Sequence, residues 1–241
     1  MSTCRVESCL KKTRSFLKVN KIFLDFLSVI FIGLASLVVS YSALDVSNKL
    51  LGVSEISIMP HFIIGTRYKI DSESQKYVED TLFLNNVGAP ISNLKWETAT
   101  FLVLQGGGME HNYVFIPLNG YYSGQVLTSN VMGELSTKIG YLNRDKFSAL
   151  YGEMMAQNRL RDLEGHYFMQ VMTFSKVGYE DRLGRRAAVY FKAYAKISEA
   201  TAMPFFEANS NGLMLELGRA LFSDVLSSSK AKSALVFSEI P

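Results

Sequence analysis

Few side chains in this sequence have the types and spacing that catalysis or metal binding requires. The three histidines, His61, His111 and His166, stand far apart, and none forms a metal-ligand pair or neighbours a nucleophile in a known motif. His111 has a carboxylate neighbour in Glu110, and folding could bring Asp181 to them. Such a trio would act as general acid and base in a hydrolase. We keep a hydrolase as the alternative to a non-enzymatic function.

Other patterns that could do chemistry are weaker. Cys4 and Cys9 have no histidine nearby, which predicts free thiols rather than metal ligands. The glycine run at 106–108 lacks the lysine and the following helix of a phosphate-binding loop. We therefore predict no catalytic residue, no cofactor and no metal. The basic excess is confined to residues 1–21, and the near-neutral remainder argues against nucleic-acid binding.

The strongest signal is an uncharged, apolar run at residues 26–44. A helix of this length is roughly 28 Å long, close to the hydrocarbon thickness of a bilayer. We predict a transmembrane helix at 22–44, a linker at 45–55 and a β-rich outer domain at 56–241. The alternative is a cleaved signal peptide, although the apolar core of such a peptide is usually only about 7–15 residues long.

The tail at 1–21 sets the expected orientation. It holds six Lys and Arg residues against a single Glu. Basic residues beside the first span are retained in the cytoplasm. We expect a single-pass protein of a bacterial inner (cell) membrane with a cytoplasmic N-terminus and a periplasmic or extracellular outer domain.

Small residues form a stripe within the predicted span. Gly33, Ser36 and Ser40 follow helical spacing and so share one face. Small residues let two membrane helices approach closely, which predicts self-association or packing against another subunit. The alternative is that small residues are simply common in such helices.

Strands are predicted through most of the outer domain, from alternating polarity and from β-branched and aromatic residues. Pro60 cannot donate to a ladder, so its strand is predicted to be the first or an edge strand. Asn86 and Gly88 are residue types that accept left-handed backbone angles in a corner. The turn at 179–185 is predicted to close a late hairpin. The predicted strands lie at 56–70, 81–85, 93–104, 113–118, 167–174 and 187–197.

Two helices are predicted beside the strands, a helical insert at about 142–163 and a C-terminal helix at about 211–227. Apolar residues recur at helical spacing in both. The methionine-bearing stripe of the insert could dock a partner, although packing on the sheet is the alternative. The candidate interaction surface comprises Tyr121, Tyr122, Met154 and Met155.

Three short motifs carry a resemblance. These are Ser-Ile-Met-Pro-His-Phe at 57–62, Leu-Asn-Asn-Val-Gly-Ala-Pro at 84–90, and Tyr-Glu-Asp-Arg-Leu-Gly at 179–184. Their order after a single span resembles that in uncharacterised bacterial membrane-anchored proteins with an immunoglobulin-like β-sandwich outer domain. The resemblance implies a mainly-β, sandwich-like fold. The helical insert and C-terminal helix depart from that pattern, which keeps an α+β fold as the alternative.

The predicted function is non-enzymatic. We expect the outer domain to bind partners as a structural or sensing subunit of a bacterial envelope complex. One alternative is a scaffold subunit of a secretion or conjugation channel, by analogy of layout alone. The other is a hydrolase of envelope polymers that uses Glu110, His111 and Asp181.

Overall fold

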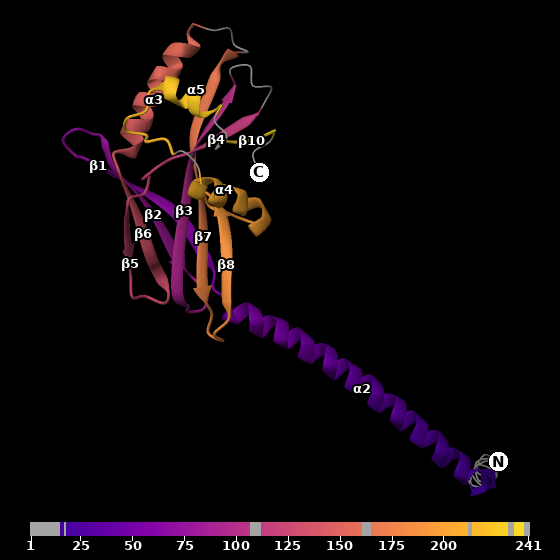
Figure 1. Ribbon diagram of the computed structural model, residues 1–241. Coiled ribbons are helices and arrows are strands. Elements are labelled where there is room, and N and C mark those ends of the chain that lie inside the picture. The colour runs from indigo at the N-terminus through magenta and orange to yellow at the C-terminus, as the bar shows by residue number, and fades with distance from the viewer. Residues whose placement is uncertain are drawn as a thin grey trace, which may run out of the picture. The chain divides into compact units, whose positions relative to one another are not determined.

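The computed structural model describes residues 15–16, 18–106, 112–160, 165–211, 214–230 and 234–238. Their contacts divide the chain into two units, Met1–Ser57 and Ile58–Pro241. Among the described residues of the first unit, those from Lys21 onward form one long helix, and the second unit is mainly β (Figure 1).

The first unit is built on α2, Lys21–Ile58, which is long and apolar enough over Lys21–Leu50 to cross a membrane. None of its most apolar stretch is buried within the molecule. The residues predicted as a linker, 45–55, are helical and continue α2. Pro60 lies two residues beyond the end of the helix, where its ring would disrupt a further turn.

The second unit contains two antiparallel sheets. The four-stranded sheet has the order β1-β2-β6-β5, and the six-stranded sheet has the order β10-β4-β3-β7-β8-β9. The first comprises β1 Phe62–Ile70, β2 Tyr77–Asn86, β5 Gly124–Leu127 and β6 Gly133–Tyr141. The second comprises β3 Ser92–Gly106, β4 Tyr113–Pro117, β7 Tyr167–Glu180, β8 Arg186–Lys192, β9 Ala195–Ile197 and β10 Leu235–Phe237.

Most predicted strands are confirmed. β2 and β3 include the predicted ranges 81–85 and 93–104, and β7 pairs with β8 as the predicted hairpin. β1 is the first strand and lies at a sheet edge, but it begins only at Phe62 because α2 takes residues 56–58. The strand predicted at 187–197 is broken at Ala193, whose φ of 50° turns the chain back into β9.

The two sheets pack against each other through an inter-sheet cluster. Trp96 and Val177, from the long strands β3 and β7, meet the inward side chains of the smaller sheet there. Tyr179 extends this contact, because its ring lies 5.1 Å from that of Phe62 on β1. The inter-sheet cluster comprises Phe62, Ile64, Leu82, Leu84, Ile91, Trp96, Leu135, Val177 and Phe191.

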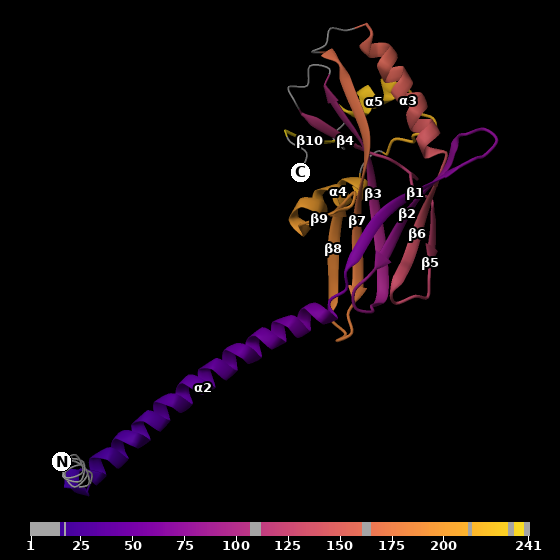
Figure 2. The same cartoon turned by 180° about the vertical axis from the view of Figure 1, so that it is seen from behind.

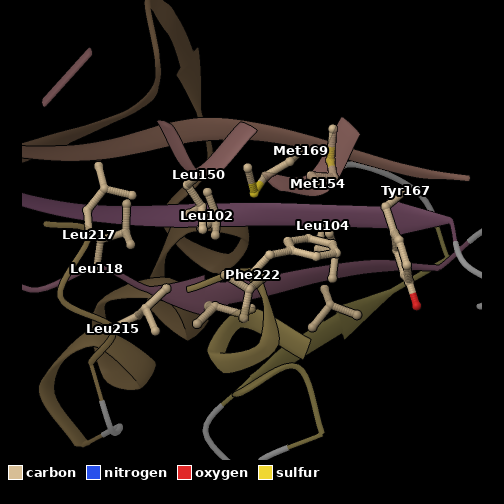
Figure 3. Packing of buried hydrophobic residues seen from close by; sticks show 13 residues of the cluster. Leu102, Leu104, Leu118, Leu150, Met154, Tyr167, Met169, Leu215, Leu217 and Phe222 are labelled. Atoms are coloured by element: carbon tan, nitrogen blue, oxygen red, sulfur yellow. The ribbon is translucent and has the colours of Figure 1, made fainter. Parts of the chain in front are cut away.

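Further along the same face of β3 and β7, helices replace the smaller sheet. Here α3, Asn143–Asn158, and α5, Phe222–Ser228, cover the strands (Figures 1 and 2). Leu102 and Leu104 of β3 pack among side chains of both helices in what we call the helix-side cluster, the thirteen buried residues drawn in Figure 3. The predicted helical insert at 142–163 thus contains α3 as a covering layer.

The opposite face of the six-stranded sheet carries a phenylalanine cluster under α4, Glu199–Asn211. Phe205 of α4 stacks on Phe174 of β7 with ring centroids 3.8 Å apart. Neither side chain is exposed. The phenylalanine cluster comprises Ala99, Phe101, Val103, Phe115, Phe174 and Phe205.

The C-terminal helix predicted at 211–227 is too long. Among its described residues, Asn211 is the last residue of α4, and the chain is helical again only from Phe222, in α5. Leu215 instead extends the edge of the sheet: its N–H donates to Pro117 over 2.8 Å, and its carbonyl accepts from Asn119 over 2.9 Å. Gly218, a poor helix former, lies in the turn that follows. A second helix near the C-terminus, α4, covers the opposite face of the sheet and was not predicted, because its internal Pro204 disfavours a helix prediction.

The corner between β2 and β3 works differently from the prediction. Neither Asn86 nor Gly88 has a positive φ. The buried Asn86 side chain accepts from the N–H groups of His61 (3.1 Å) and Gly88 (3.0 Å). Its amide donates to the carbonyls of Ala89 (2.7 Å) and Val131 (3.3 Å). A Cβ at Gly88 would strike the backbone at Met59–His61, so glycine is needed for close approach.

Candidate functional site

A cleft lies where the smaller sheet ends and α3 begins, above the middle of β3 and β7. The face that β3 and β7 present here becomes polar between the inter-sheet and helix-side clusters. Thr100 and Thr173 occupy this stretch, with their hydroxyl oxygens 3.1 Å apart. The apolar core is therefore interrupted between these two clusters, at the position of the cleft.

Two adjoining hollows make up this Asp80 cleft, with volumes of about 390 and 160 Å³. Both are lined by Tyr68, Asp80, Tyr121 and Val171. The larger adds α3 side chains, and the smaller reaches the β8–β9 turn. The remaining lining residues are Arg144, Phe147, Ser148 and Tyr151 of the larger hollow, and Thr66, Leu82, Tyr122, Thr173, Ala193 and Tyr194 of the smaller.

Asp80 places a carboxyl group where β2 would be expected to bury an apolar side chain. It is 4 % exposed and precedes Leu82 and Leu84 on the inward face of the strand. The hydroxyl of Tyr121 donates to its Oδ2 over 3.4 Å. Burial raises the pKa of Asp80 above its usual range, which the attraction of Arg144 only partly offsets.

This raised pKa has a consequence for stability. Between the ordinary carboxyl pKa and the higher folded value, the folded protein binds more protons than the unfolded chain. Asp80 therefore makes the fold less stable as pH rises through that interval. A carboxyl group kept in the core at such a cost is typical of a functional position.

Arg144 brings the opposite charge to the same cleft. It lies in the first turn of α3, and its guanidinium carbon is 4.4 Å from the ring centroid of Tyr77 and 4.9 Å from that of Tyr68. Cation–π contacts of this kind hold a guanidinium in place, and Arg144 also interacts with the Tyr68 hydroxyl. Asp80 and Arg144, both in the described part of the chain, form no ion pair with each other.

Tyrosines supply several of the remaining polar groups of the lining. Tyr121 and Tyr122 pack edge to face, with ring centroids 5.0 Å apart, and burial raises the pKa of both. They therefore remain neutral hydroxyl groups at physiological pH. The neighbouring Asn143 amide donates to the carbonyl of Tyr121, which ties α3 to this loop. Tyr194 hydrogen-bonds Thr66 over 3.0 Å and joins the two sheets at the smaller hollow.

The predicted interaction residues are distributed unevenly around this cleft. Tyr121 and Tyr122 line it, half-buried. Met154 is 1 % exposed within the helix-side cluster, whereas Met155 is 42 % exposed on α3.

In the first unit, the face of α2 at Gly33 is open, since a Cβ there would meet nothing within 4 Å. Ser36 and Ser40, which share its predicted face, are exposed as well.

Of the three residues of the alternative hydrolase site, the structure describes only Asp181. Glu110 and His111 lie outside the described residues. Asp181 has a local role in the β7–β8 turn: its Oδ1 accepts from the N–H groups of Leu183 (2.8 Å) and Arg185 (2.9 Å), and its Oδ2 from Arg185 Nε (2.8 Å). Hydrogen bonds from the Arg185 backbone hold the pKa of Asp181 below its usual range. Its carboxylate is thus committed to the turn.

Sequence reasoning missed Asp80, Tyr68 and Arg144, the residues that give the cleft its charge and shape. A usable signal existed at Asp80, which continues the inward alternation of Leu82, Leu84 and Asn86 by one more position. A strand predicted from residue 80 onward would have placed a carboxylate in the core and marked it as a candidate.

The chemistry that this cleft offers is binding through charge, hydrogen bonds and aromatic faces. Among the described residues, no group of three or more His, Cys, Asp or Glu could hold a metal ion. No protein-family model, curated protein or solved structure matches this chain.

Proposed function

We propose that this chain is a single-pass protein of a bacterial inner membrane, with α2 as its anchor and a β-sandwich-like outer unit that binds rather than catalyses. The N-terminal tail lies in the cytoplasm, and the outer unit faces the periplasm or extracellular space. In this role the protein is a structural or sensing subunit of an envelope complex, held to its partners by α2 and by the outer unit.

The anchor is supported by the character of α2 and its flank. The helix exposes large apolar side chains around its circumference, including Phe31 (64 %) and Leu37 (67 %), which only lipid or another apolar surface would cover. The basic tail supports the orientation. The open stripe at Gly33, Ser36 and Ser40 supports packing against a second membrane helix.

The observation that carries the binding role is the Asp80 cleft. It combines concave shape, aromatic walls and a few convergent polar groups, the combination typical of ligand sites. Burial also raises the pKa of the Asp80 carboxyl group, a property that is common at functional sites. The sensing version of the proposed function uses this cleft directly.

The anchor and orientation are tested by thiol labelling in intact spheroplasts. Ser72→Cys puts a thiol on the exposed β1–β2 turn, and the natural Cys4 and Cys9 report the tail. A membrane-impermeant maleimide is expected to label Ser72→Cys and to reach Cys4 and Cys9 only after the membrane is opened. Labelling of the tail thiols from outside would contradict the orientation. A shortened mature chain without these thiols would contradict the anchor and indicate a cleaved signal peptide.

The binding role is tested separately, by isolating the full-length protein from membranes together with whatever accompanies it. A stable association with other envelope subunits is the expected result.

A further inference from the structure

We propose that the Asp80 cleft binds a small zwitterion of the α-amino-acid type, with the ligand ammonium at Asp80 and its carboxylate at Arg144. This inference rests on the proposed function and specifies the ligand class of its sensing version. It arises from the two opposite charges that line one hollow without forming an ion pair.

The anionic half of the cleft fits an ammonium group. Among the described residues, Asp80 accepts one long side-chain hydrogen bond, from Tyr121 at 3.4 Å, which leaves acceptor capacity for a ligand. Tyr68 and Tyr121 line both hollows together with Asp80, so their aromatic rings and hydroxyl groups surround a ligand held there. Binding a cation would also stabilise the ionised form that burial disfavours.

The cationic half fits a carboxylate. Arg144 is exposed in the first turn of α3, and its guanidinium lies over the rings of Tyr68 and Tyr77. A guanidinium held in this way presents a fork of N–H donors that matches the two oxygens of a carboxylate. The adjacent Ser148 hydroxyl, which also lines the larger hollow, adds a further donor.

The rest of the larger hollow fits a hydrophobic side chain. Phe147, Tyr151 and Val171 line it, with the rings of Phe147 and Tyr151 5.9 Å apart. Its volume of about 390 Å³ lies near the lower end of the range for small-molecule pockets, roughly 300–1,000 Å³. The expected ligands are therefore amino acids with apolar or aromatic side chains rather than long polymers.

The test uses the full-length protein in detergent micelles and isothermal titration with L-phenylalanine. Two analogues serve as matched controls: phenethylamine, which lacks the carboxylate, and 3-phenylpropionate, which lacks the ammonium. We expect L-phenylalanine to bind and each analogue to bind at least about tenfold more weakly, because each loses one charge-assisted pair. Equal binding of L-phenylalanine and either analogue would overturn the proposal.

Variants assign the two ends of the ligand. Arg144→Gln is expected to weaken L-phenylalanine about tenfold or more and leave phenethylamine unchanged. Asp80→Asn is also expected to weaken the binding of L-phenylalanine about tenfold or more, but to leave the binding of 3-phenylpropionate unchanged. Arg159→Gln, an exposed change at the other end of α3, is the control and should bind as the parent does. Variants that weaken zwitterion and analogues alike would contradict the assignment.

The outcomes separate this inference from the function on which it rests. If no amino acid binds, or if N-acetylglucosamine binds in its place, the ligand class is wrong. Envelope subunits that still accompany the protein would then leave the proposed function standing. Binding of L-phenylalanine by a protein that is isolated without any partner would support the proposed ligand class and contradict the proposed role in an envelope complex.

Discussion

Replacing Phe205 with alanine will lower the free energy of unfolding of the second unit by about 3–5 kcal/mol, the range typical of a buried phenylalanine truncated to alanine. The side chain is fully buried and is the contact by which α4 enters the phenylalanine cluster. It stacks on Phe174 at 3.8 Å and lies 5.5 Å from Phe101 and 5.1 Å from Phe115. Its removal leaves a cavity that the rigid sheet beneath cannot close.

The measurement is denaturant unfolding of the full-length protein in micelles, followed by the fluorescence of its single tryptophan. Trp96 is buried in the inter-sheet cluster and so reports on the second unit alone. Phe168→Ala is the matched control, because Phe168 is 63 % exposed and its loss should change stability by no more than about 0.5 kcal/mol. Equal effects of the two changes would show that α4 does not pack on the sheet.

Asn86→Ala will cost about 3 kcal/mol, because the backbone groups that the side chain satisfies lose their partner where water does not replace it. The N–H groups of His61 and Gly88 and the carbonyl of Ala89 are affected most. Val131 loses less, since its carbonyl also accepts from the N–H of Ile91 over 3.4 Å. The corner that joins β1, β2, β3 and the β5–β6 turn should loosen as a unit.

The control for this prediction is the neighbouring residue. Asn85 lies on the same strand, and its buried Oδ1 has no hydrogen-bond partner among the described residues, so Asn85→Ala should be close to neutral or stabilising. Urea midpoints for the two variants give the comparison directly, with an unchanged slope as the sign that only stability has changed. A loss in Asn85→Ala as large as that in Asn86→Ala would contradict the role assigned to this corner.

How far the fold could be predicted depended on how local its signals are. β3 and β7 could be recognised because alternation over a long strand is a local pattern, and the β7–β8 hairpin because its turn residues are adjacent. The structure of the C-terminal segment at 211–227 could not be predicted in this way. Its apolar spacing imitates a helix, but the backbone of Leu215 hydrogen-bonds with Pro117 and Asn119, a contact between distant segments.

The site was harder to predict than the fold for the same reason. Thr66, Asp80, Tyr121, Arg144 and Thr173 come from separate elements, and no short motif contains two of them. The tyrosine pair was recognised by residue type, but its significance depends on Asp80, which is close only in the folded chain. Apolar packing was predictable from pattern, whereas convergence of charges required the topology.

The proposal that this chain acts by binding within an envelope complex is tested most directly by the mass of what is extracted with it. The full-length protein is taken from membranes in mild detergent, its particle mass is measured, and its companions are identified. We expect a stable assembly with membrane or periplasmic subunits in fixed proportion, and its loss when Gly33 is replaced by leucine. A particle that contains one copy of this chain and no other protein would contradict the proposal.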